Sequence, residues 1–251
     1  MTDLEKHRYW NVVLRHREML GRHPALRAVY AHWGRGIRSQ LADVPGINVE
    51  LGCGCGAMSE HLPGFEHTDL YPHDWVDRVV DAQAMPYDAG SCANLVAVDM
   101  LHHLPDAAAF FREVTRVLAP AGRLVLLEPL VTPYSYLVYK LFHHEPVDMS
   151  ADPFGPVSTV DPESGEACNT AIPTLVFGRG RKAFERRFVG LRIAGFRRLD
   201  AVVYPLTGGF SRATRVPAAW VDRLMSVEDR LTKWMGRLVA LRMQVTLEKT
   251  R

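Results

Sequence analysis

The sequence has 251 residues, 47% of them hydrophobic and 23% charged, which is enough apolar material for one globular domain with a sizeable core. The formal net charge of +2 gives no electrostatic reason to expect a nucleic acid as partner. The first residues contain no apolar segment of the secretory type, and the most apolar stretch, 124–142, is interrupted by charged residues and prolines. We therefore expect neither a signal peptide nor a membrane span.

The spacing of the cysteines predicts that they are reduced and form no disulfide. They contain no Cys-x-x-Cys pair, and two of them lie in a glycine-rich loop where a disulfide would be strained; they are Cys53, Cys55, Cys92 and Cys168. The cytoplasm is therefore the expected location. The basic residues are mostly arginine, which together with many alanines and glycines indicates a GC-rich genome.

Residues 1–45 are expected to form a helical cap on the main domain. Apolar residues recur at three- and four-residue spacings over 4–20 and 26–41, which predicts two helices. Pro24 lies where the second helix would begin, a position that suits proline.

Between residues 46 and 130 the pattern changes to short apolar strands alternating with turns and helices. The expected strands are 47–51, 65–69, 78–81, 94–99 and 123–128, and the expected helices are 58–62 and 105–118. This alternation predicts a parallel sheet with helices on both faces. Ligands of such sheets bind beyond the carboxyl ends of the strands.

Seven prolines between residues 129 and 182 interrupt this pattern, and we interpret 131–182 as a loop-rich lid over the ligand site. Residues 183–251 should complete the sheet. A helix is expected at 184–193, a sixth strand at 196–204, a long helix at 220–241 and a last, edge strand at 244–248. We treat residues 1–251 as one domain.

The long helix carries an apolar stripe with a seven-residue period, formed by Trp220, Leu224, Val227, Leu231, Trp234, Leu238 and Leu241. Such a stripe is more typical of a helix packed on its own domain than of a dimer seam. We therefore predict internal packing and keep a homodimer as the alternative.

A glycine-rich loop follows the first expected strand and carries most of the functional interpretation. Gly52, Gly54 and Gly56 leave the backbone bare, so that a polar ligand can approach it, and the next helix would present free N–H groups. Gly52, Gly54 and Ala57 also satisfy the dinucleotide pattern G-x-G-x-x-G/A, and a merely structural tight turn is a further alternative.

Acidic residues near this loop favour a cationic ligand over a pyrophosphate. Glu50 stands two residues before Gly52, where a carboxylate can face the amino-acid end of S-adenosylmethionine. Asp69 ends the second strand and can accept both ribose hydroxyls, and Asp81 with Ala82 ends the third, where an acid can accept the adenine amino group. The residues therefore favour S-adenosylmethionine over NAD.

Four runs give the chain a clear resemblance to a known family. They are Val49-Glu-Leu-Gly-Cys-Gly-Cys-Gly56, Asp81-Ala-Gln-Ala-Met-Pro86, Asp99-Met-Leu-His-His-Leu104 and, after Arg116, Val-Leu-Ala-Pro-Ala-Gly-Arg-Leu-Val-Leu-Leu-Glu-Pro129. Over residues 45–130 the sequence resembles the class I S-adenosylmethionine-dependent methyltransferase superfamily, especially its bacterial small-molecule branch. It departs from the family at Ala121, where glycine is frequent, and in the short segment between the second and third strands.

The resemblance implies an α/β fold with a Rossmann-like, mostly parallel seven-stranded sheet, and S-adenosylhomocysteine as product. It also implies that Gly52, Gly54 and Gly56 wrap the methionine part of the cofactor, while Asp69 holds the ribose. By the same resemblance Asp81 and Ala82 hold the adenine, and the segment from Asp99 to His103 lies beside the sulfonium.

Transfer to a hydroxyl would benefit from a general base, for which histidine is the usual residue. The candidates are His102, His103, His143, His144, Glu145 and Asp148. We take His144, Glu145 and His103 as the catalytic candidates, with Glu145 or Asp148 orienting His144. A solvated charge cluster is the alternative for the lid residues. A metal held by His144, Glu145 and Asp148 is a weaker alternative, because the spacing matches no metal signature, and no metal is predicted.

The predicted function is methylation of a hydroxyl on a small-molecule acceptor, such as a saccharide or secondary metabolite, because the lid mixes aromatic, histidine and acidic residues. N- or C-methylation stays open, as does a lipid acceptor, given the apolar stretch 130–142. The competing classes are a nicotinamide-dependent oxidoreductase and a non-catalytic cofactor-binding protein.

Overall fold

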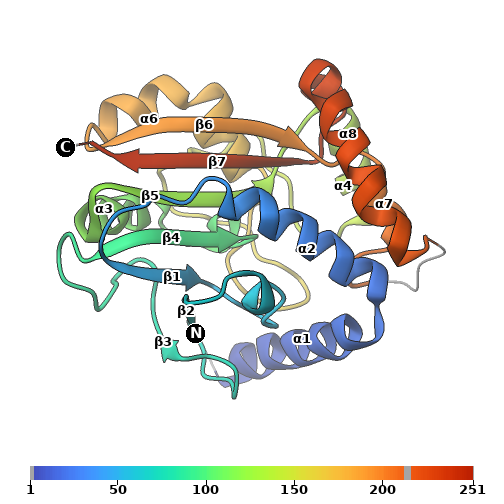
Figure 1. Ribbon diagram of the computed structural model, residues 1–251, viewed down its shortest axis with the longest axis horizontal. Helices are drawn as coiled ribbons and strands as arrows, with labels where there is room; N and C mark the ends of the chain where they lie inside the picture. The colour runs from blue at the N-terminus through green and yellow to red at the C-terminus, as the bar shows by residue number, and fades with distance from the viewer. Residues whose placement is uncertain (1–2, 212–215, 251) are drawn as a thin grey trace.

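The computed structural model describes residues 3–211 and 216–250, with side chains from residue 7 onward. The first two residues of the predicted cap and the last residue of the chain therefore lie outside the described residues. Within them the strands form one seven-stranded sheet in the order β3-β2-β1-β4-β5-β7-β6 (Figure 1). The strands are β1 (Ile47–Leu51), β2 (Glu66–Asp69), β3 (Arg78–Val79), β4 (Cys92–Val98), β5 (Leu118–Pro129), β6 (Leu191–Leu199) and β7 (Arg242–Lys249).

The sheet is parallel except at β7, which runs antiparallel to both β5 and β6. The predicted mostly parallel, seven-stranded α/β fold is confirmed. The prediction that the last strand is an edge strand is wrong. β7 lies between β5 and β6, and its residues 242–248 are largely buried because both neighbours and both faces cover them.

Several other predicted bounds shift: β5 begins at Leu118 and not at 123, and the helix expected at 58–62 is only a 3₁₀ turn. The sixth strand occupies Leu191–Leu199 and not 196–204, because the chain turns at Asp200, whose φ of 54° ends the extended run, and then enters α7 (Val203–Thr207). The helix expected at 184–193 is α6 (Arg181–Arg187), which ends before the strand begins.

Helices cover both faces of the sheet. Successive side chains of a strand point to opposite faces, so Leu95 of β4 packs in the cluster that contains α3 (Ala107–Val117), whereas Val96 packs in the cluster that contains α2 (Pro24–Arg38). The second cluster also includes side chains of α1 (Asp3–Arg22) and α8 (Ala218–Val239). As predicted, Pro24 begins the second helix.

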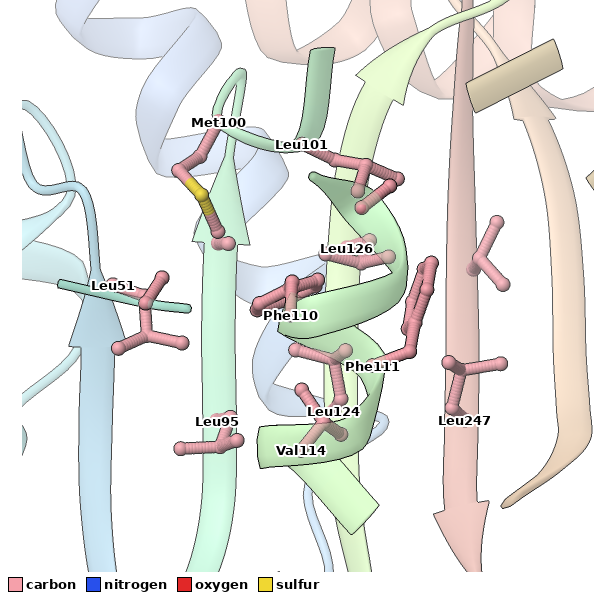
Figure 2. Close-up of a cluster of buried hydrophobic side chains, with 14 of the residues drawn as sticks. Leu51, Leu95, Met100, Leu101, Phe110, Phe111, Val114, Leu124, Leu126 and Leu247 are labelled. Atoms are coloured by element: carbon pink, nitrogen blue, oxygen red, sulfur yellow. The ribbon is translucent and has the colours of Figure 1, made fainter. Parts of the chain in front are cut away.

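Helix α3 supplies the densest part of the core. Asp106 caps it by accepting a hydrogen bond from Ala109 N at 2.9 Å, and its apolar face lies over β4, β5 and β7. Figure 2 shows Phe110, Phe111 and Val114 of this helix above the buried side chains of those strands. Phe111 also meets the rings of Phe177, Phe184 and Phe188, so it joins α3 to the segment that precedes β6.

The segment interpreted as a loop-rich lid is partly helical. It contains α4 (Pro133–Phe142), α5 (Ile172–Thr174) and the π-helical turn η3 (Leu175–Arg179), whereas 143–171 is mostly loop. Two of its prolines start helices and do not break them, because Pro133 and Pro173 lie in the first turns of α4 and α5. Two short 3₁₀ turns, η1 (Ser59–His61) and η2 (Leu101–His103), follow β1 and β4.

Helix α8 packs on the domain through a row that the sequence did not predict. The buried row consists of Val221, Met225, Glu228, Thr232 and Gly236. Glu228 accepts hydrogen bonds from the backbone N–H groups of Val202 and Val203, and Gly236 allows close approach to Arg198. Six of the seven stripe residues, from Trp220 to Leu238, are exposed, so the predicted internal packing of the stripe is wrong. Only Leu241, beyond the helix, is buried.

In the described part of the chain, no helix is both long enough and apolar enough to cross a membrane.

Replacement of Phe111 by alanine should lower the free energy of unfolding by roughly 3–5 kcal/mol, because it leaves a cavity among three other phenylalanines. Urea denaturation measures the loss. Val189→Ala, at an exposed position, is the control and should change stability by less than about 0.5 kcal/mol. A loss no larger than that of the control would contradict the packing described.

Candidate active site

The glycine loop lies at the carboxyl end of β1, next to the ends of β2 and β4. Gly52, Gly54 and Gly56 have φ values of 67°, 50° and 73°, in the left-handed region that glycine adopts readily. A Cβ at Gly52 would come within 2.7 Å of Met100 Cγ. A Cβ at Gly54 would meet no atom within 4 Å, so this backbone faces open space that a ligand can use.

Asp69, at the end of β2, holds the glycine loop. Its buried carboxylate accepts hydrogen bonds from Gly54 N at 2.8 Å, from the Tyr9 hydroxyl at 3.0 Å and from Tyr71 N at 3.2 Å. Burial raises the pKa of Asp69, and these hydrogen bonds oppose the rise. The predicted ribose-binding carboxylate therefore lies directly against the predicted loop.

Three further residues lie close to Asp69 and the glycine loop but belong to no sequence motif. Tyr9 comes from α1, and its hydroxyl covers Asp69. Trp75 donates from Nε1 to Gly54 O at 2.8 Å, and the Arg17 guanidinium lies 3.9 Å from the Trp75 ring while donating to Cys55 O. The amino-terminal cap thus closes over the loop.

Glu50 and Asp81 occupy different environments. Glu50 is buried and its Oε2 lies 2.5 Å from His67 Nδ1; burial raises the pKa of Glu50, and His67 opposes the rise. Asp81 is exposed, two residues beyond β3, where it accepts a hydrogen bond from Gln83 N at 2.8 Å; Ala82 beside it is buried. The parallel strands bring both acids to the same rim as Asp69.

Asp99 follows β4 with a φ of 53° and forms an ion pair with Arg242. Arg242 is buried, with its guanidinium 4.5 Å from the Trp33 ring and 5.6 Å from the Tyr204 ring. Asp200 lies on its other side, and burial raises the pKa of that carboxyl to about 7. The predicted sulfonium end of the rim is thus bordered by a cation held among aromatic rings.

A second cluster joins η2 to the lid. His102 Nδ1 lies 2.7 Å from Glu128 Oε2, and its Nε2 lies 3.3 Å from Glu145 Oε2. Burial lowers the pKa of His102, but the hydrogen bonds to Glu128 and Glu145 outweigh it and raise the pKa to about 10. His102 is therefore an imidazolium between two carboxylates.

His103 lies beside it and is partly open, with a quarter of its side chain exposed (25%). Its Nε2 is 3.5 Å from Glu145 Oε1, whereas its buried Nδ1 has no hydrogen-bond partner among the described residues. Burial raises the pKa of Glu145, but the bonds to His102 and His103 hold that pKa well below its usual range. Two of the three predicted catalytic residues therefore meet.

His144 does not join them. Its Nε2 lies 3.3 Å from Asp161 and 3.4 Å from Glu163, and its side chain is 48% exposed. Asp148 accepts hydrogen bonds from Ser150 within its own turn. The predicted orientation of His144 by Glu145 or Asp148 is thus contradicted, because the loop directs these neighbouring side chains to different partners.

The positions of these side chains also decide which of them could hold a metal ion together. The weaker metal alternative of His144, Glu145 and Asp148 is not assembled, for the reason just given. A different set could hold an ion, since donor atoms of His102, His103, Glu145 and Cys168 all lie within 4.8 Å of one another. Nitrogen, oxygen and sulfur donors of this kind suit zinc.

Glu166 is a further site residue that sequence reasoning missed. It lies in the lid turn between the paired residues Val160 and Ala167. Burial raises the pKa of Glu166 to about 7; His103 opposes the rise and Asp69 adds to it, so the carboxyl lies near both halves of the site.

The strand order, the glycine loop and the acid at the end of β2 define a Rossmann-like, cofactor-binding α/β protein. Residues 49–126 match a family model described as a methyltransferase domain. A curated relative, the 27-O-demethylrifamycin SV methyltransferase of Amycolatopsis mediterranei (strain S699), is 42% identical over 67 residues, which cover 25% of this chain and 25% of that enzyme. The chain thus matches about a quarter of the relative's length.

Among the solved structures that resemble the chain are two that cover nearly nine tenths of it. A SAM-dependent methyltransferase from Archaeoglobus fulgidus superposes with a TM-score of 0.52 at 11% identity, covering 89% of this chain and 94% of that one. The geranyl diphosphate C-methyltransferase of Streptomyces coelicolor has a TM-score of 0.49 at 14% identity, covering 87% and 78%. Residues 49–126 thus carry a methyltransferase domain, and the likeness to the Archaeoglobus fulgidus structure shows a shared fold.

The raised pKa of Glu166 predicts a pH dependence of stability. Between about pH 4.5 and about pH 7 the folded carboxyl keeps a proton that the unfolded chain releases, so its contribution to stability falls as the pH rises through this window. Glu166→Gln removes the ionisable carboxyl and with it this loss of stability. The melting temperature of the variant, relative to that of wild type, should therefore rise between pH 4.5 and pH 7. Glu185→Gln, on the exposed face of α6, is the control; parallel curves for wild type and Glu166→Gln would contradict the burial of Glu166.

Proposed function

We propose that the chain is a cytoplasmic enzyme that transfers the methyl group of S-adenosylmethionine to a hydroxyl of a small molecule, such as a saccharide or secondary metabolite. One observation carries the proposal: the pair His103–Glu145 lies on the same sheet rim as the Gly54–Asp69 contact. The relative is named a 27-O-demethylrifamycin SV methyltransferase, and this name, which refers to an oxygen, supports the choice of hydroxyl.

The cofactor half would be held by the residues already on the rim. Asp69 would exchange the Tyr9 hydroxyl for ribose hydroxyls, and the backbone at Gly54 would accommodate the methionine part. Gly52 and Gly56 supply the turn, Glu50 lies beneath it, and Asp81 with Ala82 would border the adenine. Bound S-adenosylmethionine supplies an electrophilic methyl group on a sulfonium; the protein has to align the acceptor with it at about 3–3.5 Å.

His103 is the base that the geometry favours. If its Nε2–H donates to Glu145, its Nδ1 keeps a lone pair without a partner among the described residues. That nitrogen is buried, so the acceptor has to displace the side chains that cover it before the lone pair can take the proton of the acceptor hydroxyl. His102 cannot fill this role, because its two nitrogens already face Glu128 and Glu145 and it is charged. Glu145 then orients His103, and Asp99 with Arg242 borders the acceptor space.

Asp69→Asn should weaken binding of S-adenosylhomocysteine by about tenfold or more, because hydrogen bonds to an ionised acceptor are roughly twice as strong as neutral ones. Isothermal titration calorimetry measures the change. Asp88→Asn, at an exposed loop position, should bind like wild type. Equal affinities for the two variants would refute the role of Asp69.

His103→Ala should lower kcat by about 10²–10⁴-fold, the usual contribution of a general base. Methyl transfer from labelled S-adenosylmethionine is followed with saccharide and phenolic hydroxyl acceptors, and with amine and carbon nucleophiles as competing classes. His144→Ala is the matched control, since its side chain faces Asp161 and Glu163. Loss of turnover in His144→Ala with normal turnover in His103→Ala would reverse the assignment.

A further inference from the structure

The outer face of α8 presents a long apolar row to solvent. Trp220, Leu224, Val227, Leu231, Trp234 and Leu238 follow one another at spacings of four and three, so they form one stripe, and each is exposed. Trp234 is 89% exposed. The helix packs on its own domain through the other row, so the described residues leave this stripe uncovered.

The charges of α8 are sorted by face. Asp222 and Asp229 bind His32 on α2, and Glu228 accepts backbone hydrogen bonds, so each acid of the helix has a partner on the protein. The basic residues Arg223, Arg230, Lys233 and Arg237 are exposed, and none of them has an ion-pair partner in the part of the chain that the structure describes. A row of arginines seven residues apart therefore flanks the apolar stripe.

Helix α4 exposes a second set of apolar side chains close to the end of α8. It packs beside the end of α8, where Val138 and Val239 contribute to one cluster, and it exposes Leu137, Leu141 and Phe142, the last by 74%. Figure 1 shows α4 and α8 together at the end of the molecule where the parallel strands terminate. The surface thus adjoins the candidate site, because α4 leads directly into His143–Glu145.

We propose that the α8–α4 face docks on an anionic phospholipid bilayer. An amphipathic helix with tryptophan and leucine on one side and arginine and lysine beside them is the composition that lies in a membrane interface. These cations have no ion-pair partner among the described residues, and they complement a negative lipid surface.

A second copy of the chain fits this face less well. Two α8 stripes packed against each other in antiparallel order would place the row Arg223, Arg230 and Arg237 opposite itself, and like charges would repel. In parallel order the opposing row would be Val221, Glu228 and Met235, and the first two are already buried in their own domain. The charge pattern therefore favours lipid over self-association. The inference rests on these helices and not on the proposed chemistry, so it holds whichever acceptor is methylated.

The test is flotation of the full chain with vesicles of phosphatidylcholine alone and of phosphatidylcholine mixed with phosphatidylglycerol. Wild type should float with the anionic vesicles and much less with the neutral ones, and high salt should weaken binding. The double variant Trp220→Gln with Trp234→Gln, and the triple variant Arg223→Gln with Arg230→Gln and Arg237→Gln, should each lower the bound fraction at least about tenfold.

Val189→Gln and Arg186→Gln are the matched controls, because both positions are exposed elsewhere on the molecule and should leave binding unchanged. Quenching of tryptophan fluorescence by brominated lipid gives a second readout, which should drop in Trp234→Phe. Failure of wild type to float, or equal flotation of wild type and the tryptophan variant, overturns the proposal. A dimer in light scattering that the tryptophan variant dissociates would instead identify the face as an interface between two copies.

Discussion

The Asp69 carboxylate makes the contacts on which the proposed cofactor half of the site depends. It joins the end of β2 to the glycine loop through Gly54 N and to the amino-terminal cap through the Tyr9 hydroxyl. A buried carboxylate requires such donors, since burial without them would be costly. Under the proposed function, ligand hydroxyls would take the place of the Tyr9 hydroxyl without leaving the carboxylate unpaired.

The proposed acceptor half is built from segments that meet only in the fold. Glu128 at the end of β5 fixes His102, and Glu145 from the lid spans His102 and His103, so the lid is tied to the rim by charge. The buried Arg242 borders the opposite side through Asp99. The lid, the cap and the outer surface of α4 and α8 therefore all converge on the carboxyl ends of the strands, which is where sheets of this type bind ligands (Figure 1).

Local pattern predicts the core of this architecture and fails where contacts are distant in sequence. The glycine loop and the short apolar strands have signatures within a few residues, so the sheet and the position of Gly52–Gly56 were predictable. The Tyr9–Asp69 bond spans 60 residues and the Arg242–Asp99 pair spans 143, and neither leaves a local signal. The predicted packing of the α8 stripe failed for a related reason. The helix packs in part through Gly236, Thr232 and Glu228, and a hydrophobic pattern does not reveal such residues.

A crystal structure of the chain with S-adenosylhomocysteine tests the central claim most directly. The expected result is a ribose on the Asp69 carboxylate, with the Tyr9 hydroxyl displaced, the homocysteine part along the backbone at Gly54 and the sulfur on the side of His103. A ligand bound elsewhere, with the Tyr9–Asp69 hydrogen bond intact, would contradict it.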